Sequence, residues 1–365
     1  FRSLRHGFSL TACSPPRQLG GRNLACVTSP TVFRAPGRVN LIGDHTDYTG
    51  GLVLPMAIDR YTTIEAVPQT SAIDLASTSD TSPVHLSLPV TSPETVSPPW
   101  GRYVAGVAAE LGNDCRGFRG TVTTTLPIGS GLSSSAALEV ATALACGAPR
   151  DPLALAQLCQ RAEQRATGVP CGIMDQLTSV AGVKDHALLI DCHSLEISPV
   201  RIPDGARIIV KFIAHRRLAS SAYGQRVTEC ATAERLIGPL RSASLRDADS
   251  IADDVIRRRA RHVVSENERV RQAATALAAG DLARCGSLMV ESHASLRDDY
   301  EVSTPEMDAA VEAALSVPGV FGARLTGGGF GGCIVILART DAAITVDDTT
   351  SWEVRAVDGS LNANS

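Results

Sequence analysis

The sequence predicts an α+β fold of two domains, and three observations lead to that prediction. The chain has 365 residues, the length of two domains of ordinary size. Hydrophobic residues make up 44% and charged residues 20% of it, which is typical of a globular protein. Segments with strand alternation and segments with helical periodicity follow one another along the chain. We expect an N-terminal domain over residues 31–185 and a C-terminal domain over 186–365, preceded by an atypical, poorly ordered leader over 1–30.

The elements of the N-terminal half follow from residue type and spacing. Residues 31–65 are rich in aliphatic and β-branched side chains and predict two strands around a polar loop. Residues 65–98 are rich in Ser, Thr and Pro, which predicts short strands and surface loops. Apolar residues recur on one helical face over 100–111, whereas Thr and Val alternate as in a strand over 120–126.

Later elements are mostly helical. A strong helix former follows the serine run at 133–135. Helices are then expected over 152–166 and, after a proline, over 171–181. Strands follow over 187–190 and around 200–214, and helices between 224 and 298. A strand, a glycine loop and a second strand are expected over 323–337.

Charge and cysteine content exclude several classes of protein. The net charge of −4 lacks the basic character of nucleic-acid binders, so we expect no nucleic-acid partner. No apolar run approaches the roughly 18 residues of a membrane helix, so we expect no membrane partner. The ten cysteines have neither C-x-x-C pairs nor zinc spacing, which predicts reduced thiols in a cytoplasmic protein. Residues 1–30 are basic and without acids, which leaves a targeting peptide open, but they lack the apolar stretch of a secretion signal.

The scarcity of lysine excludes one kind of phosphate site. Only two of the 34 basic residues are lysines, Lys184 and Lys211. A Walker-type loop needs a lysine directly after its glycines, and neither lysine lies in a glycine-rich loop. Phosphate chemistry in this chain must therefore use backbone N–H groups, arginine, hydroxyls or a metal.

The most informative segment is a glycine loop followed by a serine run and a helix, over residues 129–135. Glycines let the backbone approach a ligand closely, and the following helix N-terminus offers free N–H groups and a positive dipole end. The serine hydroxyls can bind phosphate oxygens or Mg²⁺, an ion often held by only one or two protein groups. Glu163 is a candidate second ligand of that ion. Taken alone, the segment could equally be a flexible turn that caps a helix.

A second segment, Gly37 to Gly51, concentrates polar side chains between two apolar stretches. These side chains are Arg38, Asp44, His45, Thr46 and Asp47. Such a density of donors and acceptors suits the recognition of sugar hydroxyls, which need partners at several angles. A polar surface hairpin is the alternative.

Two further segments are ambiguous by themselves. Asp175 lies in the first turn of a predicted helix, where an acid can be functional or can simply stabilise the helix end. The glycine string at 327–332 lacks the G-x-G-x-x-G order, a following helix and a downstream acid. We therefore exclude a Rossmann-type dinucleotide site there.

Together these segments resemble the galactokinase family, which belongs to the GHMP kinase superfamily. The likeness runs from about residue 31 to 337 and includes 37–51, the serine loop, 171–176, the arginine-rich stretch 258–264 and 292–303. The resemblance implies the GHMP-kinase fold, with mixed sheets and helices in two domains and the active site in the cleft between them. It also implies ATP-dependent phosphorylation of D-galactose at the C1 hydroxyl, giving galactose 1-phosphate and ADP, the first committed step of galactose catabolism by the Leloir pathway.

The resemblance further implies roles for individual residues. Asp175 matches the proposed catalytic base for the anomeric hydroxyl, and Arg38 matches the arginine that positions Asp175 and stabilises the transition state. The residues implied to bind the sugar are Arg38, Asp44, His45, Thr46, Asp47, Gly172, Asp175 and Tyr223. The residues implied to bind the nucleotide are Trp100, Gly129, Ser130, Gly131, Leu132, Ser133, Ser134 and Ser135. Mg²⁺, bound with the co-substrate ATP, is implied to contact Ser135 and Glu163.

Two departures from the family pattern leave questions open. Family members usually have Glu where this chain has Asp44, and the shorter side chain withdraws the carboxylate by about 1.5 Å, which could shift sugar selectivity. The stretch 211–218 also differs, and the basic residue near Asp175 could be His215 or Arg216. The alternatives are a kinase for N-acetylgalactosamine or L-arabinose, and a galactose- and ATP-binding sensor without catalysis. The intact serine loop favours an enzyme, which we expect to be a monomer or a weak homo-oligomer.

Overall fold

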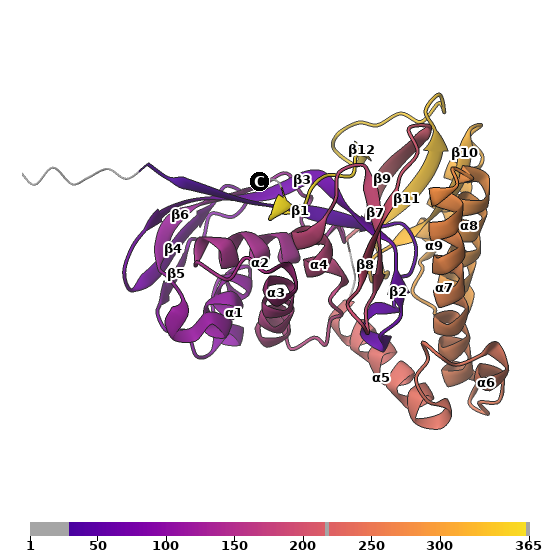
Figure 1. Ribbon diagram of the computed structural model, residues 1–365, viewed down its shortest axis with the longest axis horizontal. Coiled ribbons are helices and arrows are strands. Elements are labelled where there is room, and N and C mark those ends of the chain that lie inside the picture. Colours follow the sequence, from indigo (N-terminus) through magenta and orange to yellow (C-terminus); the bar gives the residue numbers. More distant parts are fainter. Residues whose placement is uncertain (1–28, 216–218, 363–365) are drawn as a thin grey trace, which may run out of the picture.

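The computed structural model describes residues 29–215 and 219–362. The predicted leader over 1–30 therefore lies outside the described residues except for its last two, and Arg216 lies outside them as well. Within the described part, the strands form three sheets, and helices pack beside them (Figure 1). The predicted mixture of sheets and helices is confirmed.

The first sheet is built from the N-terminal half of the chain. Its strand order is β1-β3-β6-β4-β5. The strands are β1 Thr31–Asn40, β3 Pro55–Pro68, β6 Phe118–Thr124, β4 Ala72–Ser77 and β5 Val84–Ser87. One face of this sheet carries helices α1 Gly101–Leu111, α2 Ser134–Ala145, α3 Pro152–Thr167 and α4 Met174–Ala181 (Figure 1). The helices and strands predicted for this half are therefore present.

The ends of α3 and α4 have identifiable causes. α3 begins because the Asp151 side chain accepts a hydrogen bond from the N–H of Ala154 at 2.8 Å, and it ends at Gly168, which adopts the left-handed region with φ 70°. α4 starts at Met174 and not at Cys171, so the predicted start was wrong by three residues. The carbonyl of Cys171 accepts bonds from two glutamine side chains of α3, which use it outside a helix.

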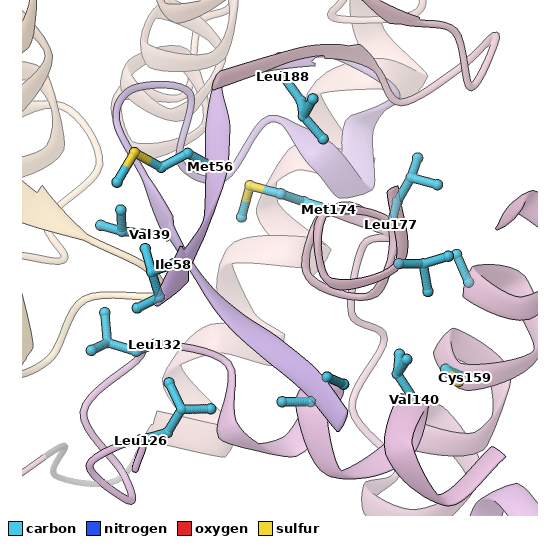
Figure 2. Packing of buried hydrophobic residues seen from close by; sticks show 14 of the residues in the cluster. Val39, Met56, Ile58, Leu126, Leu132, Val140, Cys159, Met174, Leu177 and Leu188 are labelled. Carbon is cyan, nitrogen blue, oxygen red and sulfur yellow. The ribbon is translucent and has the colours of Figure 1, made fainter. Parts of the chain in front are cut away.

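A buried hydrophobic core joins this sheet to its helices. Figure 2 shows Val39 of β1 and Ile58 of β3 in the same cluster as Met174 of α4. Leu126 and Leu132 belong to it too, and they anchor the two ends of the glycine loop with exposed fractions of 3% and 1%. Burial of one leucine side chain contributes about 1.5–3 kcal/mol, so both ends of the loop are firmly held.

The second sheet is built from the C-terminal half, in the order β10-β11-β9-β12. Its strands are β10 Val320–Thr326, β11 Gly332–Arg339, β9 Ala206–Ala214 and β12 Ser351–Val354. The predicted strand, glycine loop and strand form the antiparallel pair β10-β11. The short edge strand β12 was not predicted, because only its pairing with β9 identifies it.

Helices flank the second sheet. They are α5 Ala219–Ile237, α6 Leu245–Asp249, α7 Asp254–Ala278, α8 Leu282–Asp298 and α9 Pro305–Leu315. The helical pattern predicted between 224 and 298 is confirmed, whereas α9 was not predicted. α8 and α9 pack on β10. Among the described helices, none combines the length and the apolar character that crossing a bilayer requires.

Two connections join the halves. The strand β2 Leu52–Val53 pairs with β7 His186–Asp191, which pairs in turn with β8 Ile197–Arg201. After β12 the chain returns to the N-terminal half, where the N–H of Val357 donates to the carbonyl of Ala57 at 3.1 Å, and Figure 1 marks the C-terminal end beside β1 and β3. The division at residues 185 and 186 stays a prediction.

Candidate active site

A cleft of about 740 Å³ is lined by residues from both halves of the chain. This volume is in the range of small-molecule sites. The sequence-predicted residues that line it are Arg38, Asp44, His45, Asp47, Trp100, Gly129, Gly131, Ser133, Ser134, Ser135, Glu163, Gly172, Asp175 and Tyr223. The fold thus brings segments that are far apart in the sequence to one cavity.

Asp175, in the first turn of α4, is held from two sides. The Nε of Arg38 donates to its Oδ1 at 2.8 Å, and a second guanidinium nitrogen lies 2.7 Å from the same oxygen. The Ser133 hydroxyl donates to Oδ2 at 2.5 Å. The third nitrogen of Arg38 donates to the carbonyl of Gly131 at 2.6 Å. The carboxylate therefore has one orientation, at the junction of the serine loop and the Gly37–Gly51 segment.

The position of Arg38 depends on a close approach at Gly37. The register of β1 shifts between Pro36 and Arg38, and the N–H of Arg38 donates to the carbonyl of Leu132 at 3.2 Å. A Cβ at position 37 would lie 2.6 Å from that carbonyl and 2.3 Å from the Leu126 side chain. Only glycine lets the strand pass this close to the loop.

The serine loop leads into α2 through an unusual backbone conformation. Ser133 has φ 58° and ψ 46°, in the left-handed region that residues other than glycine rarely adopt. This bend places Ser134 and Ser135 at the start of the helix, where they line the cleft. Because the first N–H groups of a helix have no intrahelical acceptor, this end of α2 can receive an anion. The arrangement fits the anion site that the sequence predicted.

Glu163, on α3, lies in a group of acidic side chains beside the serine loop. The side-chain amide of Gln176 donates to Glu163 at 2.6 Å and to Glu139 at 3.1 Å. Burial, followed by the charge of Asp175, raises the pKa of Glu163 to about 7. Burial also raises the pKa of Glu139, a fully buried residue of α2, well above its usual range.

Ser135 and Glu163 fit a Mg²⁺ ion. Both residues line the cleft, Ser135 acts on Glu163 by lowering the pKa of its carboxyl against the effect of burial, and hydroxyl and carboxylate oxygens are the ligands that this ion prefers. A cation there would also offset the repulsion between Glu163 and Asp175. No group of three or more His, Cys, Asp and Glu side chains that could hold a metal occurs in the described part of the chain. A Mg²⁺ site at Ser135 and Glu163 would therefore be completed by phosphate oxygens and water.

Glu163→Gln should stabilise the ligand-free protein at pH 8 and have much less effect at pH 5. The folded-state pKa of Glu163 is raised from 4.5 to about 7, so folding takes up a proton between these pH values. The wild type therefore loses stability as pH rises through this window, and a neutral side chain escapes that loss. Urea unfolding at both pH values measures it, with the exposed Glu94→Gln as control. An equal effect of Glu163→Gln at pH 5 and pH 8 would contradict the raised pKa.

Aromatic rings surround His45, and one of them, that of Tyr223, lines the cleft with it. The His45 ring lies 5.5 Å from that of Tyr223 and 4.7 Å from that of Tyr300, measured between centroids. The hydroxyl of Tyr48 lies 3.0 Å from Nδ1 of His45 and 2.6 Å from the hydroxyl of Tyr300. His45 itself has φ 64°, a left-handed conformation that this set of contacts maintains.

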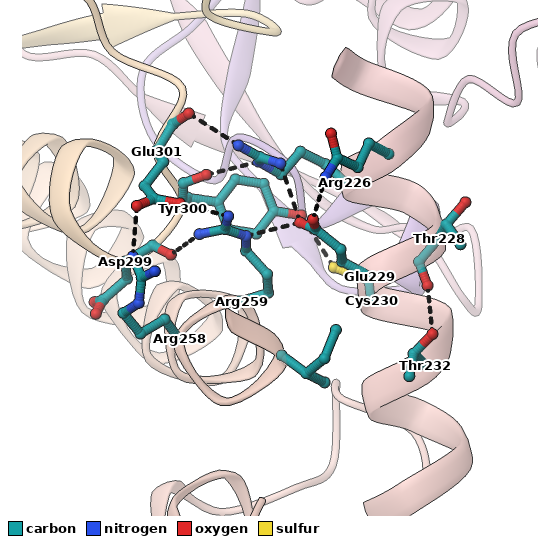
Figure 3. A network of polar contacts seen from close by, with 12 residues as sticks. Arg226, Thr228, Glu229, Cys230, Thr232, Arg258, Arg259, Asp299, Tyr300 and Glu301 are labelled. Carbon is teal, nitrogen blue, oxygen red and sulfur yellow. Dashed lines mark hydrogen bonds and ion pairs between the residues drawn. The ribbon is translucent and has the colours of Figure 1, made fainter. Parts of the chain in front are cut away.

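The backbone around Tyr300 is clamped by two buried arginines, as Figure 3 shows. Arg226 of α5 donates to the carbonyl of Tyr300 at 2.7 Å, and Arg259 of α7 donates to the carbonyl of Asp299 at 2.6 Å. Both arginines also pair with Glu229, at 3.1 and 2.8 Å. Because removing one partner of a buried ion pair leaves an uncompensated charge, these contacts are costly to break, and they keep Tyr300 beside His45.

Gly172→Ala should strongly raise the KM for the sugar that the sequence predicts as substrate and leave the KM for the predicted nucleotide nearly unchanged. A Cβ at position 172 would lie 1.9 Å from Oδ2 of Asp47 and 2.7 Å from its Cβ, so the whole Asp47 side chain would have to move. A misplacement of about 1 Å can cost about 10²-fold in rate. Steady-state kinetics with each substrate varied in turn measures this effect. Gly205→Ala is the matched control, because a Cβ there meets open space; equal KM values for wild type and Gly172→Ala would refute the prediction.

The structure does not bring every sequence-predicted residue to the cleft. Thr46 is fully buried, and its hydroxyl donates to the carbonyls of Gly43 and Leu52, so it holds the turn together. Ser130 is also fully buried, with its hydroxyl donating to Pro127, and Leu132 packs in the core. Local backbone bonds or packing already use these three side chains, so only their backbone groups are left for a ligand, and their assignment to the site stays a prediction.

Of the two candidates for a basic residue near Asp175, only His215 is described. It is exposed and lies beside the loop, since a Cβ on Gly129 would be 3.9 Å from its Nδ1.

Several residues at the cleft were missed by the sequence reasoning. Gly327 to Gly329 line it, although the glycine string was considered only as a dinucleotide loop. Arg324 pairs with Asp44 at 2.6 Å, and Glu139 shares the side-chain amide of Gln176 with Glu163. The glycine string was a signal in the sequence that could have identified Gly327 to Gly329. A single Arg on a strand or a single Glu on a helix gives no such signal, so Arg324 and Glu139 could not have been found in this way.

The chain is similar to known proteins over most of its length. The model of the GHMP kinase N-terminal domain matches residues 102–183, and that of the GHMP kinase C-terminal region matches 273–346. The fold is similar to that of Methanococcus jannaschii mevalonate kinase, at 20% identity over 91% of this chain and 100% of that one, with a TM-score of 0.63. Fold and site together define a kinase of the GHMP class.

More specific similarities narrow this class. A model of the galactokinase galactose-binding signature matches residues 26–68. Galactokinase from Homo sapiens is 48% identical over 332 residues, which cover 85% of this chain and 84% of that one. The structure of Lactococcus lactis galactokinase complexed with galactose has a TM-score of 0.80 at 32% identity, over 90% of this chain and 94% of that one. The chain belongs to the galactokinase family.

Proposed function

We propose that this protein transfers the γ-phosphoryl group of ATP to the C1 hydroxyl of D-galactose, giving galactose 1-phosphate and ADP. The observation that carries the proposal is the position of Asp175, which Arg38 and Ser133 hold between the serine loop and the segment matched by the galactose-binding signature. The human and Lactococcus relatives are galactokinases, and the latter was solved with galactose. A carboxylate at this junction is well placed to act on the hydroxyl that receives the phosphoryl group.

The chemistry that we assign to Asp175 and Arg38 follows from their geometry. Phosphoryl transfer depends mostly on positioning and on stabilisation of charge. Asp175 accepts the hydrogen of the C1 hydroxyl, orients its oxygen, and takes the proton as the bond to phosphorus forms. Arg38 keeps the carboxylate in place and supplies positive charge where negative charge develops on the transferred group.

We assign the nucleotide to the serine loop and the start of α2. The N–H groups there bind phosphate oxygens, and Trp100, whose Nε1 donates to the carbonyl of Ser82 at 3.3 Å, borders the base. Ser135 and Glu163 would hold Mg²⁺, which neutralises phosphate charge when bound. In this chain the phosphate groups are bound by helix N–H groups, serine hydroxyls and Arg38, so binding them does not require a lysine in the loop.

We assign the sugar to the opposite end of the cleft. His45, Asp47 and Tyr223 present donors and acceptors at different angles, as recognition of several hydroxyls requires. Gly172 leaves room for the Asp47 carboxylate.

We further propose a cytoplasmic location and a monomer or weak homo-oligomer. The eight cysteines in the described part of the chain are free thiols, which suits a reducing compartment that supplies ATP.

The test is ADP release with Mg-ATP and a panel of free sugars. We expect rapid release with D-galactose and little with N-acetylgalactosamine or L-arabinose, and we expect the product to carry phosphate at C1. Preference for one of the other sugars would reassign the substrate. Binding of galactose and ATP without ADP release would instead indicate a sensor.

A further inference from the structure

The carboxylate of Asp44 faces protein donors. Its Oδ2 lies 2.6 Å from a guanidinium nitrogen of Arg324, and its Oδ1 accepts a hydrogen bond from the N–H of Gly327 at 3.0 Å. The side chain is 2% exposed, although the residue borders the cleft. Almost none of its surface is therefore available to a ligand hydroxyl.

We infer that Asp44 is a positioning residue in this chain, paired with Arg324, and that it does not contact the sugar itself. This inference rests on the proposed function, because it concerns how the galactose end of the cleft is built. The family usually has the longer Glu at this position. Compared with the carboxylate of a Glu, that of Asp44 lies about one C–C bond, or about 1.5 Å, closer to the backbone. In this position it contacts Arg324 and the N–H of Gly327.

Arg324 connects the two halves of the chain at this point. It lies on β10 with a fully buried side chain, and another of its nitrogens donates to the carbonyl of Leu41 at 3.1 Å. Two residues further along β10, the hydroxyl of Thr326 donates to the carbonyl of Asn40 at 2.9 Å. The end of β10 is thus bonded to the end of β1, where the Gly37–Gly51 segment leaves the sheet.

The surrounding charges support a pairing role. The nearest other carboxylate, Glu266, lies 3.9 Å from Arg324 but pairs with Arg269 at 2.7 Å and accepts the N–H of Gly43 at 3.0 Å. Burial alone would raise the pKa of Glu266, but Arg269, His262 and Arg324 outweigh it and lower that pKa to about 2. Asp44 and Arg324 therefore depend on each other, because a buried charge without a partner is strongly unfavourable.

The pair fixes the two walls of the sugar end relative to each other. On one side, Asp44 precedes His45 and Asp47, and on the other side the bonded N–H belongs to Gly327, the first residue of the glycine turn that lines the cleft. If Asp44 acts in this way, its loss displaces the whole sugar end. If Asp44 bound one hydroxyl directly, its loss would affect only sugars that carry that hydroxyl.

The experiment compares Asp44→Asn, Arg324→Gln and the double variant on D-galactose and on its 2-, 3-, 4- and 6-deoxy analogues. We expect each single variant to raise KM about tenfold or more, since a small displacement of binding groups is costly, with kcat and the KM for ATP changed far less. The factor should be the same for every sugar, and the double variant should lose much less than the product of the two single losses. Glu353→Gln, which breaks the 2.7 Å pair with Arg207 away from the cleft, is the matched control.

A loss that disappears for one deoxy sugar, or losses that multiply in the double variant, would overturn the inference. Should Asp44→Asn fail to fold, Asp44→Glu keeps the charge and is compared on the same sugars. A common factor for all sugars supports positioning, and a factor confined to one hydroxyl refutes it. A wild-type protein that releases no ADP with galactose would refute the proposed function, which is a separate outcome.

Discussion

Asp175→Asn should lower kcat by about 10³-fold, within the range of about 10²–10⁴ for a positioned general base, while galactose and ATP still bind. The asparagine oxygen can still accept from Arg38, and its amide nitrogen can donate to the Ser133 hydroxyl, which then becomes the acceptor, so the site keeps its shape. It cannot take the proton of the C1 hydroxyl, because an amide oxygen is a far weaker base than a carboxylate. Turnover by ADP release and affinity by calorimetry measure the two effects separately.

The control for this variant is Asp114→Asn, which removes an exposed carboxylate after α1. Its kcat should equal that of the wild type. Substantial turnover of Asp175→Asn would remove Asp175 from the role of base. A parallel loss of galactose binding would indicate that Asp175 mainly binds the sugar.

Arg38→Met should lower kcat by about 10³-fold, near the lower end of the effect of arginines that stabilise phosphoryl transfer. The variant loses the ion pair with Asp175 and the hydrogen bond to Gly131, so both the base and the serine loop lose their common support. It also loses the positive charge near the transferred group. Single-turnover measurement of phosphoryl transfer separates this chemical effect from substrate binding.

Arg38→Lys should recover only part of the loss. A lysine donates from a single nitrogen, so it cannot contact the Asp175 carboxylate and the Gly131 carbonyl with the fixed geometry of a guanidinium. Arg119→Met, which replaces an exposed arginine of β6, serves as control and should be fully active. Full activity of Arg38→Lys would mean that charge alone matters and that the forked geometry does not.

Much of the architecture could be predicted from the sequence because it is local. The helix α3 carries its own start and stop signals in Asp151 and Gly168, and β10 and β11 flank a recognisable glycine string. The predictions were incomplete or wrong where contacts between residues far apart in the sequence determine whether an element forms or where it begins. The edge strand β12 exists through pairing with β9, and α4 starts late because side chains of α3 bind the carbonyl of Cys171.

For the candidate site, too, part could be predicted from the sequence and part could not. The residue types in the serine loop and the Gly37–Gly51 segment predicted phosphate and sugar chemistry, since backbone freedom, hydroxyls and carboxylates have that chemistry wherever they lie. Which of those side chains are available to a ligand was not predictable. Thr46 and Ser130 have suitable hydroxyls, yet carbonyls a few residues away already accept their hydrogen bonds.

By itself, the sequence determined the family resemblance, the order of most elements and the kinds of groups at the site. The tertiary structure decided the partners: Arg38 meets Asp175 across 137 positions, and Asp44 meets Arg324 across 280. The reason is physical. Hydrophobic periodicity specifies which face of an element is buried, but a charge–charge contact depends on how two separately buried faces are packed together, and this is set only when the whole core forms.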